Sequence, residues 1–208
     1  MTFMAPVQTT PSASPKPGLR ERKKTQTRQA IRRAAYRLFA EQGYDATPVD
    51  RIAEAADVSS STVFRYFPTK EDIVITDEYD QLMEEAFRAR PAEEPPLEAL
   101  WNAIMDTLRQ FYASEREEID TRIRLTREVP AIRARMNESM TETGRMVIGV
   151  LSERTGRPTD DLELRVFVGA VLGALQEVML HWGEQELTDD LVGVVDRTLA
   201  LLARGLTL

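Results

Sequence analysis

Residues 47–72 read TPVDRIAEAADVSSSTVFRYFPTKED, and this stretch decides the fold. Its apolar residues Val49 and Ile52 recur at helical spacing directly after a threonine and a proline, which is typical of a helix start. A second short helix is expected to start within the serine run and to end before Pro68, whose ring cannot donate the backbone hydrogen bond that a continuing helix needs. Two short helices joined by a turn of about three or four residues predict a helix-turn-helix, whose second helix enters the major groove of DNA.

The exposed face of the second helix has a composition that suits contact with DNA. Val58, Val63 and Phe67 are expected to anchor the helix in a core, which leaves mainly short hydrogen-bonding side chains on the outside. Such groups can approach base edges and phosphates. A helical hairpin that only packs within the protein is the alternative. The residues expected to face the groove are Ser59, Ser60, Ser61, Thr62, Phe64 and Arg65.

Charge is divided unevenly along the chain. The 208 residues carry a net charge of −7, which by itself argues against binding to phosphates. Residues 1–70, however, hold 12 Lys and Arg against 6 Asp and Glu, whereas the rest of the chain holds 15 against 28. Between residues 16 and 40, nine basic side chains face a single acid, Glu21. This asymmetry predicts a basic part that faces nucleic acid and an acidic part with another role, with a chance cluster of solvated charges as the alternative.

Helical periodicity and helix breakers divide the first half of the chain. Residues 1–18 are rich in Pro, Ser and Thr and predict a flexible tail. Residues 19–68 are the predicted helix-turn-helix domain, with a first helix from 22 to 42 that ends at a left-handed cap on Gly43. Residues 69–90 predict one linking helix, helix 4, which begins with a capping pair and is closed by the break PAEEPP.

Residues 91–208 are predicted to form a ligand-binding and dimerisation domain. Helices are expected at 97–113, 114–128, 130–155, 160–182 and 188–203, separated by proline and glycine signals. No stretch alternates in the manner of a strand bounded by hairpin turns. The predicted fold class is therefore all-α, with about nine helices: an N-terminal three-helix helix-turn-helix domain and a larger helical domain.

Several classes of protein are excluded by what the sequence lacks. There is no cysteine, and the single histidine, His181, has no second histidine with which to hold zinc. No phosphate-binding glycine loop, nucleophile elbow or distinct carboxylate pair is present. We therefore expect no enzyme, no cofactor and no metal. The longest apolar run, residues 166–175, is about half of the roughly 20 residues that span a membrane, so a cytoplasmic protein without a membrane partner is expected.

Residues 27–70 resemble the N-terminal DNA-binding domain of TetR-family transcriptional regulators. The resemblance lies in LFAEQGY at 38–44, in the pair Ile52 and Ala53, and in VSSSTVFRYFPTKED at 58–72. These motifs match in order and without gaps, whereas the rest of the chain matches only in length and helical content. The resemblance implies a homodimer whose two recognition helices lie about one DNA turn, roughly 34 Å, apart on a palindromic operator.

Roles in DNA binding follow from the resemblance by position. Thr47 would offer a phosphate contact, the run from Ser59 to Thr62 would face the groove, and Lys70 would bind phosphate. Asp57 stands where the family usually has glycine, which is tolerable because Asp adopts left-handed conformations more readily than most residues.

Phe64 departs from the family, because the usual residue there is a tyrosine with a phosphate-binding hydroxyl. Tyr66 is the candidate to supply a hydroxyl instead, and Arg65, at a variable position, could contact a base or a phosphate. The full predicted DNA-binding set is Arg28, Thr47, Ser59, Ser60, Ser61, Thr62, Phe64, Arg65, Tyr66 and Lys70.

The acidic remainder is expected to bind something other than DNA, and the resemblance implies a small-molecule effector. Aromatic and methionine side chains gather on the helix predicted at 97–113, and the later helices add further candidates for the wall of a cavity. For each residue, ordinary core packing is the alternative. Arg127 is the candidate partner for an anionic ligand, with a surface ion pair as its alternative. The predicted ligand-binding set is Trp101, Met105, Leu108, Tyr112, Ile123, Arg127, Met136, Met140, Phe167 and Gln176.

The last two predicted helices, helices 8 and 9, carry apolar surfaces that suit a homodimer interface. VFVGAVLGAL at 166–175 places two glycines four residues apart, and small residues at that spacing let two helices approach closely. A helix buried within one subunit is the alternative. The predicted interface consists of Gly169, Gly173, Leu191, Val195, Leu199 and Leu202, in a four-helix arrangement of two chains.

Together these features predict a ligand-responsive DNA-binding transcriptional regulator. The family's usual mode is repression, in which a small-molecule effector favours a dimer that no longer matches a double-stranded palindromic operator. The sequence leaves open the effector, the operator, the regulated genes, the sign of regulation and the number of dimers on each operator. An architectural DNA binder would explain the basic region but not the large acidic one.

Overall fold

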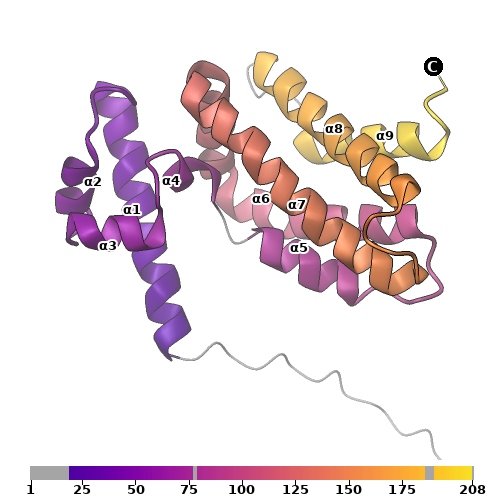
Figure 1. The fold of residues 1–208 in the computed structure, drawn as a ribbon. Helices are drawn as coiled ribbons and strands as arrows, with labels where there is room; N and C mark the ends of the chain where they lie inside the picture. The colour runs from indigo at the N-terminus through magenta and orange to yellow at the C-terminus, as the bar shows by residue number, and fades with distance from the viewer. Residues whose placement is uncertain (1–18, 77–78, 186–189, 208) are drawn as a thin grey trace, which may run out of the picture.

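The computed structural model of the chain describes residues 19–76, 79–185 and 190–207. All regular structure in these ranges is helical, and no strand occurs in them, so the all-α fold class is confirmed. The tail predicted for residues 1–18 lies outside the described residues. Within the described ranges, nine helices form two lobes, with α1–α4 in the smaller lobe and α5–α9 in the larger one (Figure 1).

The smaller lobe begins with the three helices that the sequence predicts. α1 (Leu19–Gln42) ends at Gly43, whose φ of 87° is left-handed and favours glycine. α2 (Val49–Ala55) and α3 (Ser60–Tyr66) follow, and the turn between them holds Asp57 at a φ of 54°. The helix-turn-helix and the left-handed Asp57 are therefore confirmed.

The single helix predicted at 69–90 is wrong, because the chain forms two helices there. α4 (Asp72–Ile75) is one turn long, and Thr76 after it has an extended backbone, with φ −83° and ψ 118°. α5 (Tyr79–Arg88) is a separate helix. A physical reason is visible in the sequence: the residues at 73–75 in α4 and Thr76 after it are all β-branched, and such residues lose rotamer freedom in a helix, which disfavours a helix longer than this one turn.

Four longer helices build the larger lobe. α6 (Pro96–Glu128) is kinked at Glu115, whose φ of −128° and ψ of 24° are not helical, and this kink lies where the sequence predicts the boundary between two helices. α7 (Pro130–Thr155), α8 (Leu162–Glu184) and α9 (Leu191–Ala203) agree closely with their predicted ranges. α6, α7 and α8 pack against one another, and α9 packs on α6 and α8.

Each lobe has its own hydrophobic core, and the two cores meet at α4. The core of the smaller lobe holds Phe67 and all three apolar residues of α4, and it also takes in Leu125 from the end of α6 and Ile132 from the start of α7. The core of the larger lobe is built around fully buried side chains such as Phe87 and Trp182. α4 therefore packs both against α1 and against α6 and α7, whereas α5 packs with the larger lobe alone, in contrast to the single linking helix predicted between the two domains.

Candidate functional site

The start of α3 is organised by hydroxyl groups. Ser59 is the N-cap, and its Oγ accepts a hydrogen bond of 3.2 Å from the backbone nitrogen of Thr62. The same Oγ lies 2.8 Å from Ser61 Oγ and 2.9 Å from Thr62 Oγ1. Ser60 Oγ donates to Asp50 Oδ1 at 2.5 Å, which ties α3 to α2. These hydroxyls are thus held together at the N-terminal end of the recognition helix, the end that contacts base edges in helix-turn-helix proteins.

The last turn of α3 presents larger groups. Phe64 is 49% exposed, which is unusual for a large apolar side chain, and Arg65 is exposed beside it. The guanidinium of Arg65 lies 5.3 Å from the centre of the Tyr66 ring, a cation–π contact that orients the charge. This turn can therefore offer an apolar contact and a positive charge to DNA.

Thr47 does not occupy the place predicted for it. Its side chain is fully buried, and its hydroxyl donates to the Gly43 carbonyl at 2.8 Å while accepting from Gln42 Nε2 at 3.1 Å. The N-cap of α2 is Pro48, and no side chain caps that helix. The prediction that Thr47 contacts phosphate is therefore wrong in this conformation, because the hydroxyl fixes the loop between α1 and α2.

Lys70 is held against Tyr44, in the loop that follows α1. Its Nζ donates to the Tyr44 carbonyl at 2.5 Å and lies 3.9 Å from the centre of the Tyr44 ring, whose hydroxyl donates to Glu71 at 2.9 Å. Burial lowers the pKa of Lys70, and the nearby carboxylates of Asp45 and Glu71 partly offset that effect. Arg28, also in the predicted set, lies 5.1 Å from the centre of the Phe67 ring. Both cations are thus partly engaged within the small lobe.

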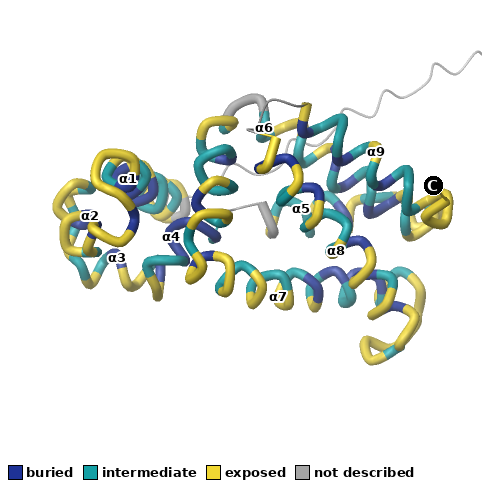
Figure 2. Tube along the Cα trace, turned by 90° about the horizontal axis from the view of Figure 1, so that it is seen from above, coloured by how far each residue is buried: buried dark blue, intermediate teal, exposed yellow. Residues whose placement is uncertain are grey.

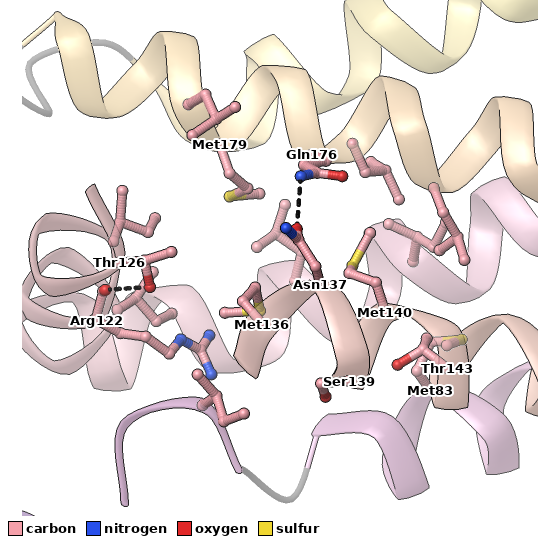
Figure 3. A pocket seen from close by; sticks show the side chains of 18 of the residues that line it. Met83, Arg122, Thr126, Met136, Asn137, Ser139, Met140, Thr143, Gln176 and Met179 are labelled. Atoms are coloured by element: carbon pink, nitrogen blue, oxygen red, sulfur yellow. Dashed lines mark hydrogen bonds between the residues drawn. The ribbon is translucent and has the colours of Figure 1, made fainter. Parts of the chain in front are cut away.

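A cavity of about 390 Å³ lies in the larger lobe and is lined mainly by α6, α7 and α8, with single residues from α4, α5 and α9 (Figure 3). Its volume is within the range of sites that bind small ligands. Six residues of the predicted ligand-binding set line it: Leu108, Ile123, Arg127, Met136, Met140 and Gln176.

The other four predicted ligand-binding residues do not line the cavity. Trp101 Nε1 donates to Asp196 on α9 at 3.0 Å, Met105 is buried in the core, and Tyr112 meets Trp182 edge-on at a ring distance of 6.1 Å. Phe167 packs against the core of the larger lobe. Three of the four lie on the stripe of α6 that includes Leu108 and packs into the core, beside the neighbouring face that carries Leu100 and Ile104 to the cavity. Helical periodicity alone does not tell which of two neighbouring apolar faces meets a cavity.

Arg122 is a cavity residue that the sequence-based prediction did not include. It lines the cavity together with Arg127 and Arg133, and Figure 3 shows its guanidinium beside Met136. Burial lowers the pKa of Arg122, with Tyr36 raising it and Arg32 lowering it further. The sequence offered no signal for it, because Arg122, Arg124 and Arg127 follow one another closely near the end of α6 and residues five apart on a helix project about 140° from each other.

The cavity also has polar groups that do not carry charge. Asn137 of α7 and Gln176 of α8 are joined by a hydrogen bond of 3.2 Å, which bridges these two helices as Figure 3 shows.

Two of the arginines that line the cavity donate to backbone carbonyls. Arg127 Nη1 donates to the Gly183 carbonyl at 2.6 Å, and Arg133 donates to the Arg127 carbonyl at 2.6 Å. Among the residues that the structure describes, no group of three or more His, Asp or Glu side chains could hold a metal ion.

Buried ion pairs and hydrogen bonds connect the cavity wall to the DNA-binding lobe. Asp72, 2% exposed, accepts from Thr69 and, at 2.9 Å, from Arg135 Nε on α7. Arg32 of α1 is buried, and it donates to Glu118 of α6 at 2.9 Å and to the Thr76 carbonyl after α4. α1 and α4 are therefore tied to α6 and α7, the same two helices that supply most of the cavity wall.

The outward face of α8 is apolar. Leu162 is 73% exposed and Val166 61% exposed, and Gly169 and Gly173, which follow at helical spacing, are exposed as well. Figure 2 colours the described part of the chain by burial. By length and composition α8 could also cross a membrane, with a mean hydropathy of 1.4, but one such helix is weak evidence of a membrane protein. An exposed apolar face of this kind marks a surface for interaction.

Three residues predicted for the dimer interface lie elsewhere. Leu191, Val195 and Leu199 on α9 are fully buried in the core of their own chain, so they cannot meet a second chain in this conformation. Leu202 is partly buried against the same core. That part of the prediction is wrong, because the apolar stripe of α9 is the side that faces α6 and α8.

Known proteins share both the sequence and the fold. Residues 31–75 match the family described as "Bacterial regulatory proteins, tetR family", and residues 94–207 match the one described as "MftR C-terminal domain". The HTH-type transcriptional regulator TcmR of Streptomyces glaucescens is 34% identical over 78% of this chain and 75% of its own length. The fatty acid metabolism regulator protein of Bacillus subtilis is 26% identical over 83% of this chain and 92% of its own.

A solved structure has the same arrangement of helices. The repressor FadR of Thermus thermophilus, in complex with lauroyl-CoA, has a TM-score of 0.56 and 26% identity, covering 87% of this chain and 95% of FadR. A helix-turn-helix joined to a helical lobe with an internal cavity defines a DNA-binding transcriptional regulator rather than an enzyme. The chain belongs to the TetR family of transcriptional regulators.

Proposed function

We propose that the protein is a cytoplasmic repressor that leaves a palindromic operator when a small molecule enters the cavity of the larger lobe. One observation carries the proposal: two of the three helices that form most of the cavity wall, α6 and α7, also hold α1 and α4 through Arg32 and Arg135. A ligand that changes the packing of α6 and α7 would therefore change the angle of the recognition helix. Such a ligand shifts a population between two states by binding one of them more tightly.

Dimerisation is the second part of the proposal. The outward face of α8, with Leu162, Val166, Gly169 and Gly173, would pack against the same face of a second chain. A Cβ atom added at either glycine would meet nothing within 4 Å, which leaves room for the partner's side chains. A two-fold pair of this kind would present two recognition helices to the two halves of a palindrome.

Filling the cavity with a larger side chain should leave binding to the operator intact but abolish release of the operator by the ligand. Met140→Trp places a larger side chain in the cavity, so we expect operator affinity to stay within about threefold of the original while release by ligand is lost. Lauroyl-CoA, the ligand of Thermus FadR, is the first probe. Fluorescence anisotropy of a labelled operator duplex measures both properties. Met140→Leu, which conserves volume, is the matched control, and normal release from Met140→Trp would contradict the proposal.

Arg65 should contact the DNA backbone rather than a base. It lies in the last turn of α3, whereas the N-terminal residues of a recognition helix contact base edges. We expect Arg65→Gln to weaken binding by a similar factor on operator and mutated operator, and to reduce the slope of log affinity against log salt by about 1. Anisotropy titrations at several salt concentrations check this. Loss of discrimination at one base pair, with the salt slope unchanged, would show that Arg65 reads a base.

A further inference from the structure

The cavity has a cationic end and an apolar end. Arg122, Arg127 and Arg133 come from the last turns of α6 and the first turn of α7, next to the residues that join the small lobe. Met136 lines the same end and packs against the core of the small lobe, and Ile75 of α4 lines it as well. The opposite end, toward the start of α6 and the middle of α7 and α8, is mostly apolar, with lining residues that include Leu100, Ile104, Val147, Val168 and Leu172.

The charge of this lining is opposite to that of the lobe around it. Residues 71–208 hold 15 Lys and Arg against 28 Asp and Glu, yet the described residues that line the cavity include three Arg and no Asp or Glu. Two of the three donate to backbone carbonyls, at Gly183 and at Arg127, and a neutral carbonyl leaves the positive charge in place. Arg127 approaches a carboxylate only at 3.8 Å, on Glu128. The cavity thus offers charge to an anion at one end and apolar surface to a tail at the other.

We propose that the effector is an amphipathic anion, bound with its charged head at Arg122, Arg127 and Arg133 and its apolar tail toward Leu100 and Val168. This inference rests on the proposed function, since it assigns a chemical class and an orientation to the ligand of the same cavity. The head group can be a carboxylate or the phosphates of a thioester carrier, and both offer oxygens to guanidinium donors.

The position of Arg122 gives the charge of the head a direct effect on the DNA-binding lobe. Arg122 is close enough to the guanidinium of Arg32 and to the side chain of Tyr36, both on α1, for the two groups to affect its pKa. Tyr36 donates to the Val74 carbonyl in α4 at 3.4 Å, and Arg32 donates to the Thr76 carbonyl that follows α4. An anion at Arg122 therefore changes the electrostatic environment of the groups that position α1 and α4. The anionic head, and not the tail alone, is what releases the operator.

The test compares three ligands with the same apolar chain on the full-length protein: dodecanoate, lauroyl-CoA and the neutral 1-dodecanol. Binding is followed by calorimetry, and release by anisotropy of a labelled operator. We expect at least one of the two anions to bind and release the operator, and 1-dodecanol to release it at least tenfold less effectively. Comparing dodecanoate with lauroyl-CoA distinguishes a free acid from a thioester as the source of the head group.

Variants on α6 locate the head. Arg122→Met replaces the aliphatic part of the side chain and removes the charged guanidinium, and it should weaken binding of the anion at least tenfold, with binding of 1-dodecanol unchanged. Arg124→Met, at an exposed position of the same helix outside the cavity, is the matched control and should bind like the original protein. If Arg122→Met does not fold, as judged by circular dichroism, Arg127→Met, at a more exposed cavity position, should give the same loss.

Failure of this inference differs from failure of the proposed function. Three results would overturn the inference and leave a ligand-released repressor standing. They are release of the operator by 1-dodecanol at the concentration that suffices for the anions, lack of binding by both anions, and unchanged anion binding in the arginine variants. Binding of an anion in the cavity without any effect on operator affinity would instead overturn the proposed function.

Discussion

The variant Val166→Asp will be monomeric and will bind its operator at least about 100-fold more weakly than the original protein. Val166 is 61% exposed at the centre of the apolar face of α8. A carboxylate there would be buried without a partner on dimerisation, which is costly. A monomer contacts one half-site, and it loses the gain in effective concentration that comes from linking two DNA-binding modules.

Light scattering after size-exclusion chromatography gives the oligomeric state, and anisotropy of a labelled operator gives the affinity. Ala89→Asp adds the same charge at an exposed position beyond the end of α5 and should remain dimeric with normal affinity. A dimeric Val166→Asp protein with normal operator affinity would show that the face of α8 is not the dimer interface.

Removing the Asp72 carboxylate should destabilise the protein by about 3 kcal/mol, because both the N–H of Thr69 and the guanidinium of Arg135 lose a buried acceptor. For a chain of this size that change corresponds to a fall in melting temperature of about 8 °C. Asp72 is nearly fully buried, whereas Arg135 keeps some exposure, which is why the expected loss is at the lower end for a broken buried pair. Thermal unfolding of Asp72→Ala, followed by circular dichroism, measures the change.

Glu138→Ala is the control for this experiment, since Glu138 pairs with the same Arg135 but is 72% exposed. Exposed ion pairs contribute little, so the melting temperature of Glu138→Ala should be nearly unchanged. Equal losses in the two variants would mean that the contact between α4 and α7 does not depend on the buried carboxylate.

The helix-turn-helix could be predicted from the sequence because its signals are local. Gly43 at the end of α1, the left-handed Asp57 in the turn and Ser59 as the cap of α3 each depend on backbone chemistry within a few residues. The same kind of signal was present at 73–76, where a β-branched run forms the one-turn α4 and the extended Thr76 that ends it, but helical periodicity across 69–90 concealed it.

The cavity and the dimer face were harder to predict because both depend on which apolar surface meets which neighbour. Trp101, Met105 and Tyr112 lie on a stripe of α6 that packs into the core. The cavity is lined instead by the neighbouring face, which carries Leu100 and Ile104 and has Leu108 at its border. On α9, the apolar stripe that includes Val195 is buried within its own chain and is not available to a second one. Sequence periodicity identifies an apolar stripe but not its partner, which only tertiary packing decides.

Sequence-specific DNA binding is the central claim, and a mobility shift tests it most directly. The purified protein is titrated against the DNA that flanks its own gene, at two salt concentrations, with random DNA as competitor. We predict a saturable shift that resists the competitor at both salt concentrations and is lost when lauroyl-CoA is added. A shift that the competitor removes as readily as it removes binding to any other duplex would contradict the account.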